Sequence, residues 1–206
     1  HGALHLSELM RFTNPAEGNA SLALREGLPE AIGFYLDHDR VHVGDQATLS
    51  DHILTAWAKD RAAGRDSIML APTRDLVAEL NHRARTHRLT QEPDKNTAAG
   101  MASVVLADGN RASAGDTVIT RSNDRRLRIS GTDWVKNGDR WTITAVNPDH
   151  SIDARHVKNG RHITIPPEYV TAAVELGYAC TIHTAQGVTA DTSHTLLTGG
   201  ESRQVA

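Results

Sequence analysis

The chain has 206 residues, a formal net charge of −3, 39% hydrophobic residues and 23% charged residues. These values are ordinary for a globular protein of one domain or two small ones, and they give no overall basic signature of nucleic-acid binding, although a local groove can still be basic. No apolar run approaches the roughly 20 residues that a membrane-spanning helix needs, so we expect no membrane association.

The lone cysteine, Cys180, cannot form an intramolecular disulfide. We therefore expect a reducing, cytoplasmic location and an inert, buried thiol. The N-terminus has neither a starting Met nor a signal-peptide pattern, which indicates a fragment of a longer protein.

The first half of the chain has the pattern of an α/β domain. Apolar residues recur at helical spacing in 19–26 and 29–36, so residues 1–45 are expected to be helical with short breaks. Ser50 or Asp51 is placed to cap a helix that ends near residue 64. The apolar run 67–71 predicts a strand buried in a parallel sheet, and a helix over 74–89 follows it.

The second half changes character after a polar, linker-like stretch at 91–96. Short strands are predicted at 117–120, 140–146, 151–157 and 162–165. Asn137-Gly138 and Asn159-Gly160 favour two-residue turns, in which both central residues need positive φ. These features predict a small inserted β-barrel that ends at Pro166-Pro167, after which the α/β domain resumes over 174–182.

The chain carries no phosphate-binding G-x-x-x-x-G-K-[ST] loop, and no acidic pair follows a strand in the way that Mg²⁺ binding requires. Alone, it should bind ATP poorly and hydrolyse none. The histidines at 150, 156 and 162 recur every six residues, but they have no Cys partners and no H-E-x-x-H motif. We therefore expect no metal site.

The most informative segment is 178–191, Y-A-C-T-I-H-T-A-Q-G-V-T-A-D. It predicts a short buried strand that leads into a polar loop, and it resembles the T-x-H-x-x-Q-G-x-T-x-D motif of superfamily 1 DNA helicases. Further segments match in the same order, and they resemble the motor part of conjugative relaxase-helicases (TraA/TrwC-like, RecD-like). They are 9–12 (L-M-R-F), 68–73 (I-M-L-A-P-T), 115–127, 134–140 and 175–179.

The resemblance implies a RecA-like, P-loop NTPase-like second helicase domain with a parallel sheet, over 1–103 and 172–206. An SH3-like β-barrel over 104–171 would interrupt it. The implied function is that of a fragment of an ATP-dependent single-stranded DNA translocase or helicase in conjugative DNA transfer. The Walker A and B domain and the final arginine-finger motif are absent from this chain, so the full-length protein would hydrolyse ATP with Mg²⁺ while the fragment alone would be inactive. The implied partners are single-stranded DNA, the first motor domain of the same polypeptide and other conjugation proteins.

The resemblance and local chemistry together suggest the site residues. Arg11 would reach the γ-phosphate, because an always-charged, bidentate cation stabilises charge on the leaving phosphate. Gln186 would bond a phosphate or relay the nucleotide state, and Gly187 would let the backbone approach closely. Candidate DNA contacts are Thr73, His183, Thr184 and Thr189 on the α/β domain, and Arg121, Asn123, Arg125 and Arg126 on the barrel.

Several of these residues have a plainer alternative. Thr73 could be a helix cap, and the arginines could simply protect an exposed hairpin edge. Trp134 and Trp141 could stack on bases or pack in the barrel core. The whole chain could also be a non-catalytic DNA- or protein-binding module with the barrel as a docking platform, or an inactive scaffold. The first of these is distinguished by whether the arginines of 121–128 share a groove with His183.

Overall fold

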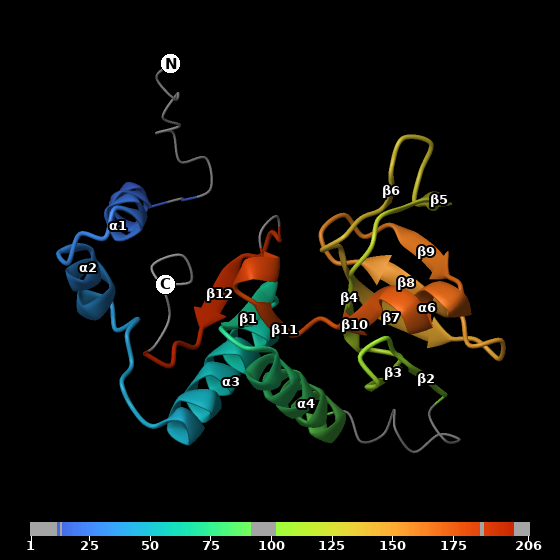
Figure 1. Cartoon of the computed structure of the whole chain (residues 1–206), viewed down its shortest axis with the longest axis horizontal. Helices are drawn as coiled ribbons and strands as arrows, with labels where there is room; N and C mark the ends of the chain where they lie inside the picture. Colours follow the sequence, from blue (N-terminus) through green and yellow to red (C-terminus); the bar gives the residue numbers. More distant parts are fainter. Residues whose placement is uncertain (1–11, 13, 92–101, 186–187, 200–206) are drawn as a thin grey trace. The chain divides into compact units, whose positions relative to one another are not determined.

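The computed structural model describes residues 12, 14–91, 102–185 and 188–199, and the chain divides into two compact units, His1–Asp45 and Gln46–Ala206 (Figure 1). The first unit contains α1 (Pro15–Arg25) and α2 (Ala31–Asp37). Asn14 caps α1, because its Oδ1 accepts the Ala16 N–H at 2.9 Å, and Pro15 follows at the first helical position. Helix is thus confirmed for these two stretches, while the predicted helical residues before Phe12 lie outside the described part of the chain.

The second unit contains a three-stranded parallel sheet built from distant parts of the sequence. Its strands are β1 (Ser67–Ala71), β11 (Ala179–Thr181) and β12 (Thr192–Thr195). The order is β11-β1-β12, and both outer strands pair in parallel with β1. Met69 and Ala71 are fully buried, as expected for the central strand of a parallel sheet.

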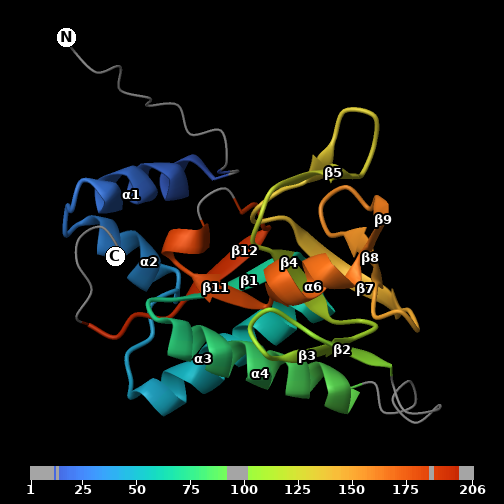
Figure 2. The same ribbon diagram turned by 45° about the vertical axis from the view of Figure 1, so that its right-hand side comes forward.

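Helices α3 (Gln46–Ala62) and α4 (Arg74–Gln91) pack on this sheet, as Figures 1 and 2 show. Their buried apolar residues are Ile53 and Trp57 on α3, and Leu76, Leu80 and Ala84 on α4. The predicted cap at Ser50 or Asp51 is wrong, because α3 already begins at Gln46. Ser50 is buried inside the helix, and the Asp51 carboxylate instead accepts from Arg83 of α4 at 2.5 Å.

The barrel is a five-stranded antiparallel sheet in the order β10-β4-β7-β8-β9, with two short hairpins beside it. The sheet strands are β4 (Thr117–Thr120), β7 (Arg140–Val146), β8 (Ile152–His156), β9 (His162–Ile165) and β10 (Val174–Leu176). The hairpins are β2 (Ser103–Val105) with β3 (Arg111–Ser113), and β5 (Asp124–Arg128) with β6 (Trp134–Val135). Trp141 is fully buried, so it packs in the core and is not available for base stacking.

The turn geometry predicted for the two Asn-Gly pairs is wrong. Gly138 and Gly160 have φ of 89° and 70°, but neither Asn137 nor Asn159 has a positive φ. A two-residue turn with positive φ at both positions is therefore absent from each place. At the second place the connection is longer, because β8 ends at His156 and β9 begins at His162.

The barrel sheet continues beyond the predicted end of the insertion at residue 171. Pro167 begins helix α6 (Pro167–Ala173) instead of ending the barrel, because proline suits the first turn of a helix. The next segment, β10, pairs antiparallel with β4 of the barrel. The expected return to the α/β domain over 174–182 therefore begins only after Leu176, where the chain crosses from the barrel sheet to the parallel sheet at Gly177.

Candidate nucleic-acid interface

The carboxyl ends of β1 and β11 lie side by side at one edge of the parallel sheet. The two strands pair through Ala71↔Thr181, and the Ile182 N–H donates to the Ala71 carbonyl at 3.2 Å. The loops that leave these strands carry Thr73 and His183, so these two residues extend from neighbouring strand ends. Ligands of open α/β sheets commonly bind beyond the carboxyl ends of the strands. We call the loops with Thr73, His183 and Thr184 the sheet edge.

Thr73 is the N-cap of α4. The Leu76 N–H donates to Thr73 Oγ1 at 3.3 Å, and the Val77 N–H donates to the Thr73 carbonyl at 3.1 Å. Capping uses the hydroxyl oxygen as an acceptor, which leaves the hydroxyl proton able to donate. Thr73 is exposed at the start of an 18-residue helix, whose first N–H groups and dipole favour an anion.

The turn after β11 is a single 3₁₀ turn, η1 (His183–Ala185), and both His183 and Thr184 are exposed. Thr184 shapes this turn: its N–H donates to Thr181 Oγ1 at 3.3 Å, and its Oγ1 donates to the Thr181 carbonyl at 3.1 Å. The His183 ring, in contrast, makes no hydrogen bond to any described residue. His183 is therefore the donor more readily offered to a ligand, and Thr184 is the residue that holds the turn in shape.

The remaining motif residues are spread across the sheet. Thr189 is exposed in the segment that leads to β12. Asp191, which we did not single out as a site residue, fastens this segment to the start of β1: its Oδ2 accepts the Asp66 N–H, and its N–H donates to the Asp66 carbonyl, both at 2.8 Å. The motif thus begins at the carboxyl edge of the sheet and ends at the opposite edge.

The predicted nucleotide-site residues lie outside the part of the chain that the structure describes. They are Arg11, Gln186 and Gly187, and their roles stay predictions.

Arg121 is the predicted barrel arginine whose charge acts on Cys180 of β11, the strand that leads into the sheet edge. Its Nε donates to Glu175 Oε2 at 2.6 Å. Burial raises the pKa of the Cys180 thiol, and both the Arg121 charge and a hydrogen bond from Thr184 oppose this rise. Cys180 is buried, as we expected, and its inertness stays a prediction.

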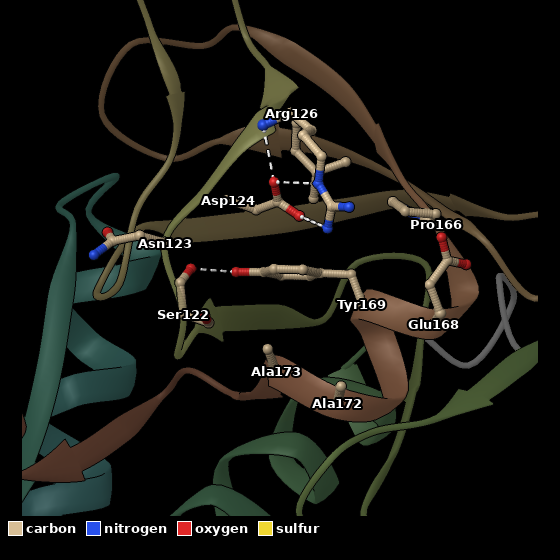
Figure 3. A pocket seen from close by; sticks show the side chains of 10 residues that line it. Ser122, Asn123, Asp124, Arg126, Pro166, Glu168, Tyr169, Ala172 and Ala173 are labelled. Carbon is tan, nitrogen blue, oxygen red and sulfur yellow. Dashed lines mark hydrogen bonds and ion pairs between the residues drawn. The ribbon is translucent and has the colours of Figure 1, made fainter.

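Asn123 and Arg126 belong instead to a pocket of about 570 Å³ between the start of β5 and helix α6 (Figure 3). Arg126 is bound to Asp124, with Nη2 at 3.0 Å from Oδ2, and this hydrogen bond lowers the pKa of the Asp124 carboxyl. The Tyr169 hydroxyl donates to the Ser122 carbonyl across the pocket. No residue of the sheet edge lines this pocket, so Asn123 and Arg126 share it with α6 and not with His183.

Arg125 lies on a third surface. Its guanidinium carbon is 5.3 Å from the centre of the Trp134 ring, on the β5–β6 hairpin. Asn123 has a structural task as well, because its Oδ1 accepts the Asn137 N–H at 3.0 Å. The four predicted barrel residues are therefore divided among three surroundings.

A buried ionic cluster joins the barrel to α4, and sequence reasoning did not identify it. Asp116, fully buried before β4, accepts from Arg85 Nε and Arg88 Nε of α4, each at 3.0 Å. The Tyr178 hydroxyl donates to the same carboxylate at 2.7 Å. Burial and the Asp116 charge raise the pKa of Tyr178.

A second contact lies nearby, where Nη2 of the buried Arg140 on β7 donates to Asp66. Burial lowers the pKa of Arg140 to about 10. Two ionic contacts therefore hold the barrel against the α/β layer.

Within the described ranges, no three His, Cys, Asp or Glu side chains gather where they could hold a metal ion. Among the described helices, none combines the length and the apolar character that crossing a bilayer requires.

Two family models match separate parts of the chain. Residues 104–175 match the Rv2311 SH3-like barrel domain, and residues 1–46 match an AAA domain. The first match covers most of the barrel, including the start of β10. The predicted fold class, an α/β fold with a parallel sheet and an SH3-like barrel, is therefore confirmed.

Two curated relatives come from Mycobacterium tuberculosis: Uncharacterized protein MT2373 (strain CDC 1551 / Oshkosh) and Uncharacterized protein Rv2311 (strain ATCC 25618 / H37Rv). Each is 35% identical over 79 residues, which are 38% of this chain and 45% of the relative. The chain thus spans less than half the length of these relatives.

Two solved Pif1 structures are also similar to the chain. One describes DNA unwinding at forked dsDNA by two coordinating Pif1 helicases (17% identity, TM-score 0.49, covering 90% of this chain and 41% of that one). The other is Bacteroides sp Pif1 in complex with ADP-AlF4 (16% identity, TM-score 0.48, covering 95% and 46%).

Proposed function

We propose that this chain is part of a superfamily 1 DNA helicase motor of the conjugative relaxase-helicase kind, which moves along single-stranded DNA in the cytoplasm. The observation that carries the proposal is the meeting of two motif segments at one sheet edge. The L-A-P-T segment ends β1 and places Thr73 at the start of α4, while the T-x-H segment ends β11 and places His183 beside it. They are far apart in the sequence and neighbours in the sheet.

The chemistry of the sheet edge suits the phosphates of a single strand. It offers a hydroxyl on Thr73, an exposed imidazole on His183 and the N–H groups at the start of α4. Such groups hold the backbone without selecting a sequence, which is what a translocating motor needs. In the proposal, Thr189 and Arg121 add further contacts from the adjoining segments.

ATP hydrolysis belongs to the whole protein in this proposal. Arg11, Gln186 and Gly187 would face a nucleotide held by the first motor domain, where Arg11 stabilises the charge that develops on the phosphates. The described residues provide no carboxylate cluster that suits Mg²⁺, so its ligands would come from that other domain. Closure on ATP and reopening after hydrolysis would advance the strand, and other conjugation proteins would be partners.

The direct test measures binding of single-stranded DNA by the chain at low and moderate salt. Thr73→Ala and His183→Ala should each weaken binding by about tenfold, because each removes a hydrogen bond to a charged phosphate. His162→Ala and Thr171→Ala are the matched controls, since both side chains are exposed away from the sheet edge. No detectable binding at low salt, or equal losses in the controls, would contradict the proposal.

The role of Arg11 is tested separately in the full-length protein. Arg11→Ala should reduce DNA-stimulated ATP hydrolysis by about 10³-fold, within the range found for arginines that stabilise phosphoryl transfer. Arg25→Ala, on the exposed end of α1, is the control. Unchanged hydrolysis in Arg11→Ala would remove Arg11 from catalysis.

A non-catalytic docking module is the second candidate, and the pocket beside Tyr169 favours it. That pocket is separate from the sheet edge, and Asp124 and Glu168 give it acidic groups. If the barrel serves only as a docking platform, Glu168→Ala should abolish partner binding while DNA binding stays absent in all variants.

A further inference from the structure

The β5–β6 hairpin stands apart from the rest of the barrel. Its two strands form a sheet of their own, and its tip projects beyond the five-stranded sheet in both views (Figures 1 and 2). The tip is closed by the Asp133 carbonyl, which accepts from Ile129 N–H at 2.9 Å and from Ser130 N–H at 3.1 Å. A hairpin of this kind can present side chains to a ligand from a fixed backbone.

The hairpin places a tryptophan on its outer side. Asp124 pairs with Val135, whose side chain is fully buried. Trp134 is the next residue to Val135 along β6, so its side chain points to the opposite face, and the Arg125 guanidinium meets its ring there although the strand pairing shifts register between Asp124 and Arg128. Trp134 is only partly buried, whereas Trp57 and Trp141, the other two tryptophans of the chain, are 5% and 0% exposed.

Two cations flank the Trp134 ring. The Arg125 guanidinium carbon lies 5.3 Å from the ring centre, and the Lys136 ammonium lies 5.5 Å from it. Lys136 also pairs with Asp133 at 2.6 Å, but Arg125 is exposed and makes no ion pair with any described carboxylate. The cluster therefore combines a large aromatic face with a cation whose charge is not neutralised.

An aromatic ring beside an unneutralised cation has the chemistry that single-stranded nucleic acid recognises. Bases stack on the ring or on the guanidinium plane, and the cations attract the adjoining phosphates. Core packing does not require the Trp134 side chain, because β6 has two residues and Val135 is the one that is buried in the core. A sequence-selective duplex contact is not suggested either, since one ring offers a stacking face and no base-edge pattern.

We propose that Trp134, Arg125 and Lys136 form a base-stacking site for single-stranded nucleic acid on the barrel, in addition to the phosphate contacts of the sheet edge. This inference rests on the proposed function, because it gives the barrel a part in holding the same strand. The sheet edge contacts the backbone of the strand, and the hairpin contacts its bases.

Tryptophan fluorescence tests the site directly. Titration of the chain with an oligo-dT strand should quench the emission of Trp134, since the other two tryptophans are buried. An abasic strand of the same length keeps the phosphates but has no bases to stack. It should bind about tenfold more weakly and quench little, because stacking of a base on an aromatic side chain contributes about this much.

Substitutions of Trp134 and Arg125 separate the contribution of base stacking to oligo-dT affinity from the contribution of charge. Trp134→Ala should weaken oligo-dT binding by about tenfold and remove the preference over the abasic strand, while Trp134→Phe, which keeps a ring, should stay within about threefold of the parent. Arg125→Ala should lower affinity and reduce the salt dependence of log K by roughly 0.7. Arg155→Ala, an exposed arginine on β8, removes the same charge and should have a smaller effect.

The outcomes distinguish this inference from the proposed function. If the parent binds oligo-dT but equally well binds the abasic strand, and Trp134→Ala binds like the parent, the stacking site is wrong and the proposed function stands. If the parent binds neither strand at low salt, both are wrong. If an acidic peptide or protein quenches Trp134 while oligo-dT does not, the cluster is a protein-binding site and the inference fails.

Discussion

The sheet edge and the barrel hold their polar side chains in different ways. At the sheet edge, Thr73 and His183 are positioned by backbone features: the pairing of β1 with β11, the start of α4 and the turn of η1. On the barrel, Arg121 and Arg126 are positioned by carboxylates, Glu175 and Asp124. The cap and the turn follow from local sequence, whereas the pairing of β1 with β11 and the Arg121–Glu175 ion pair depend on how distant segments come together.

The barrel itself contains two kinds of aspartate–arginine contact. The Asp116 side chain is 0% exposed and accepts from two arginines of α4, whereas Arg126, the partner of Asp124, is 91% exposed. A buried charge that loses its partners is costly, while an exposed pair is screened by water. The first contact should therefore fix the barrel on the α/β layer, and the second should contribute little to stability.

Removal of the buried carboxylate gives the largest expected effect. Asp116→Ala removes the carboxylate that Arg85 and Arg88 share, and such a loss costs roughly 3–5 kcal/mol of unfolding free energy. Urea unfolding followed by circular dichroism measures it. Asp124→Ala is the matched control and should change the midpoint only slightly. Equal effects for the two variants would show that Asp116 does not hold the barrel in place.

Substitution of Gly177, where the chain crosses between the two sheets, should give the next largest loss of unfolding free energy. A Cβ added there would lie 2.7 Å from the Val118 carbonyl carbon and 2.9 Å from the Ile119 nitrogen. Both are backbone atoms of β4 and cannot rotate away, so Gly177→Ala should destabilise by about 3 kcal/mol, the upper part of the range for overpacking.

Gly131→Ala is the control for this substitution, because an added Cβ would meet nothing within 4 Å there. If Gly177→Ala unfolds at the same urea concentration as the parent, β10 and β11 do not need this close approach to cross between the sheets.

The same contrast explains which parts of the fold could be predicted. The strand at 67–71 and the helix from residue 74 have strong local patterns, and the structure contains both. Parallel pairing then brings the ends of β1 and β11 to one edge, so the proximity of Thr73 and His183 could also be expected. The predicted start of α3 was wrong because the helix begins at Gln46, so Ser50 and Asp51 lie inside it, where Asp51 accepts from Arg83 of a distant helix.

The predicted strands of the barrel are confirmed at β4, β7, β8 and β9, but the surroundings of its arginines could not be predicted. Arg121 and Arg125 are close in sequence, but Arg121 pairs with Glu175 of β10 and Arg125 meets Trp134 of β6, while Arg126 pairs with Asp124 of its own strand. A run of like charges does not say where each side chain finds a partner.

Local sequence does not reveal the partners of Asp116, because Arg85 and Arg88 come from an earlier helix and Tyr178 comes from a later segment. The clue available in the sequence was an acidic residue directly before an apolar strand, at 116–120.

Tyr178→Phe is a milder test of the Asp116 cluster than Asp116→Ala, because it keeps the buried ion pairs and removes one hydrogen bond. Tyr178→Phe removes a donor to a buried carboxylate, and a hydrogen bond to a charged group contributes about 2 kcal/mol. The edge contact between the rings of Trp57 and Tyr178 should survive the change.

The effect of Tyr178→Phe should also depend on pH. The pKa of Tyr178 is raised in the folded state above its ordinary value of 10.0, so the stability it contributes is present below pH 10 and is lost as the pH rises further. The difference between the variant and the parent should thus shrink only above about pH 10. A constant difference would mean that the tyrosine ionises equally easily in both states.

The smallest expected stability effect lies at the sheet edge, at Thr73. Thr73→Ala removes the cap of α4 and should cost about 1 kcal/mol, whereas Thr73→Ser keeps the acceptor and should cost almost nothing. The two substitutions also show whether the Thr73 hydroxyl only caps α4 or also binds DNA. Both variants can be compared with the parent by urea unfolding and by DNA binding at one salt concentration. If serine restores the stability and the binding together, one hydroxyl both caps the helix and donates to the strand. If Thr73→Ala lowers the stability but binds the strand as the parent does, Thr73 is a structural cap and the phosphate contact at this edge must come from His183 and the helix N–H groups.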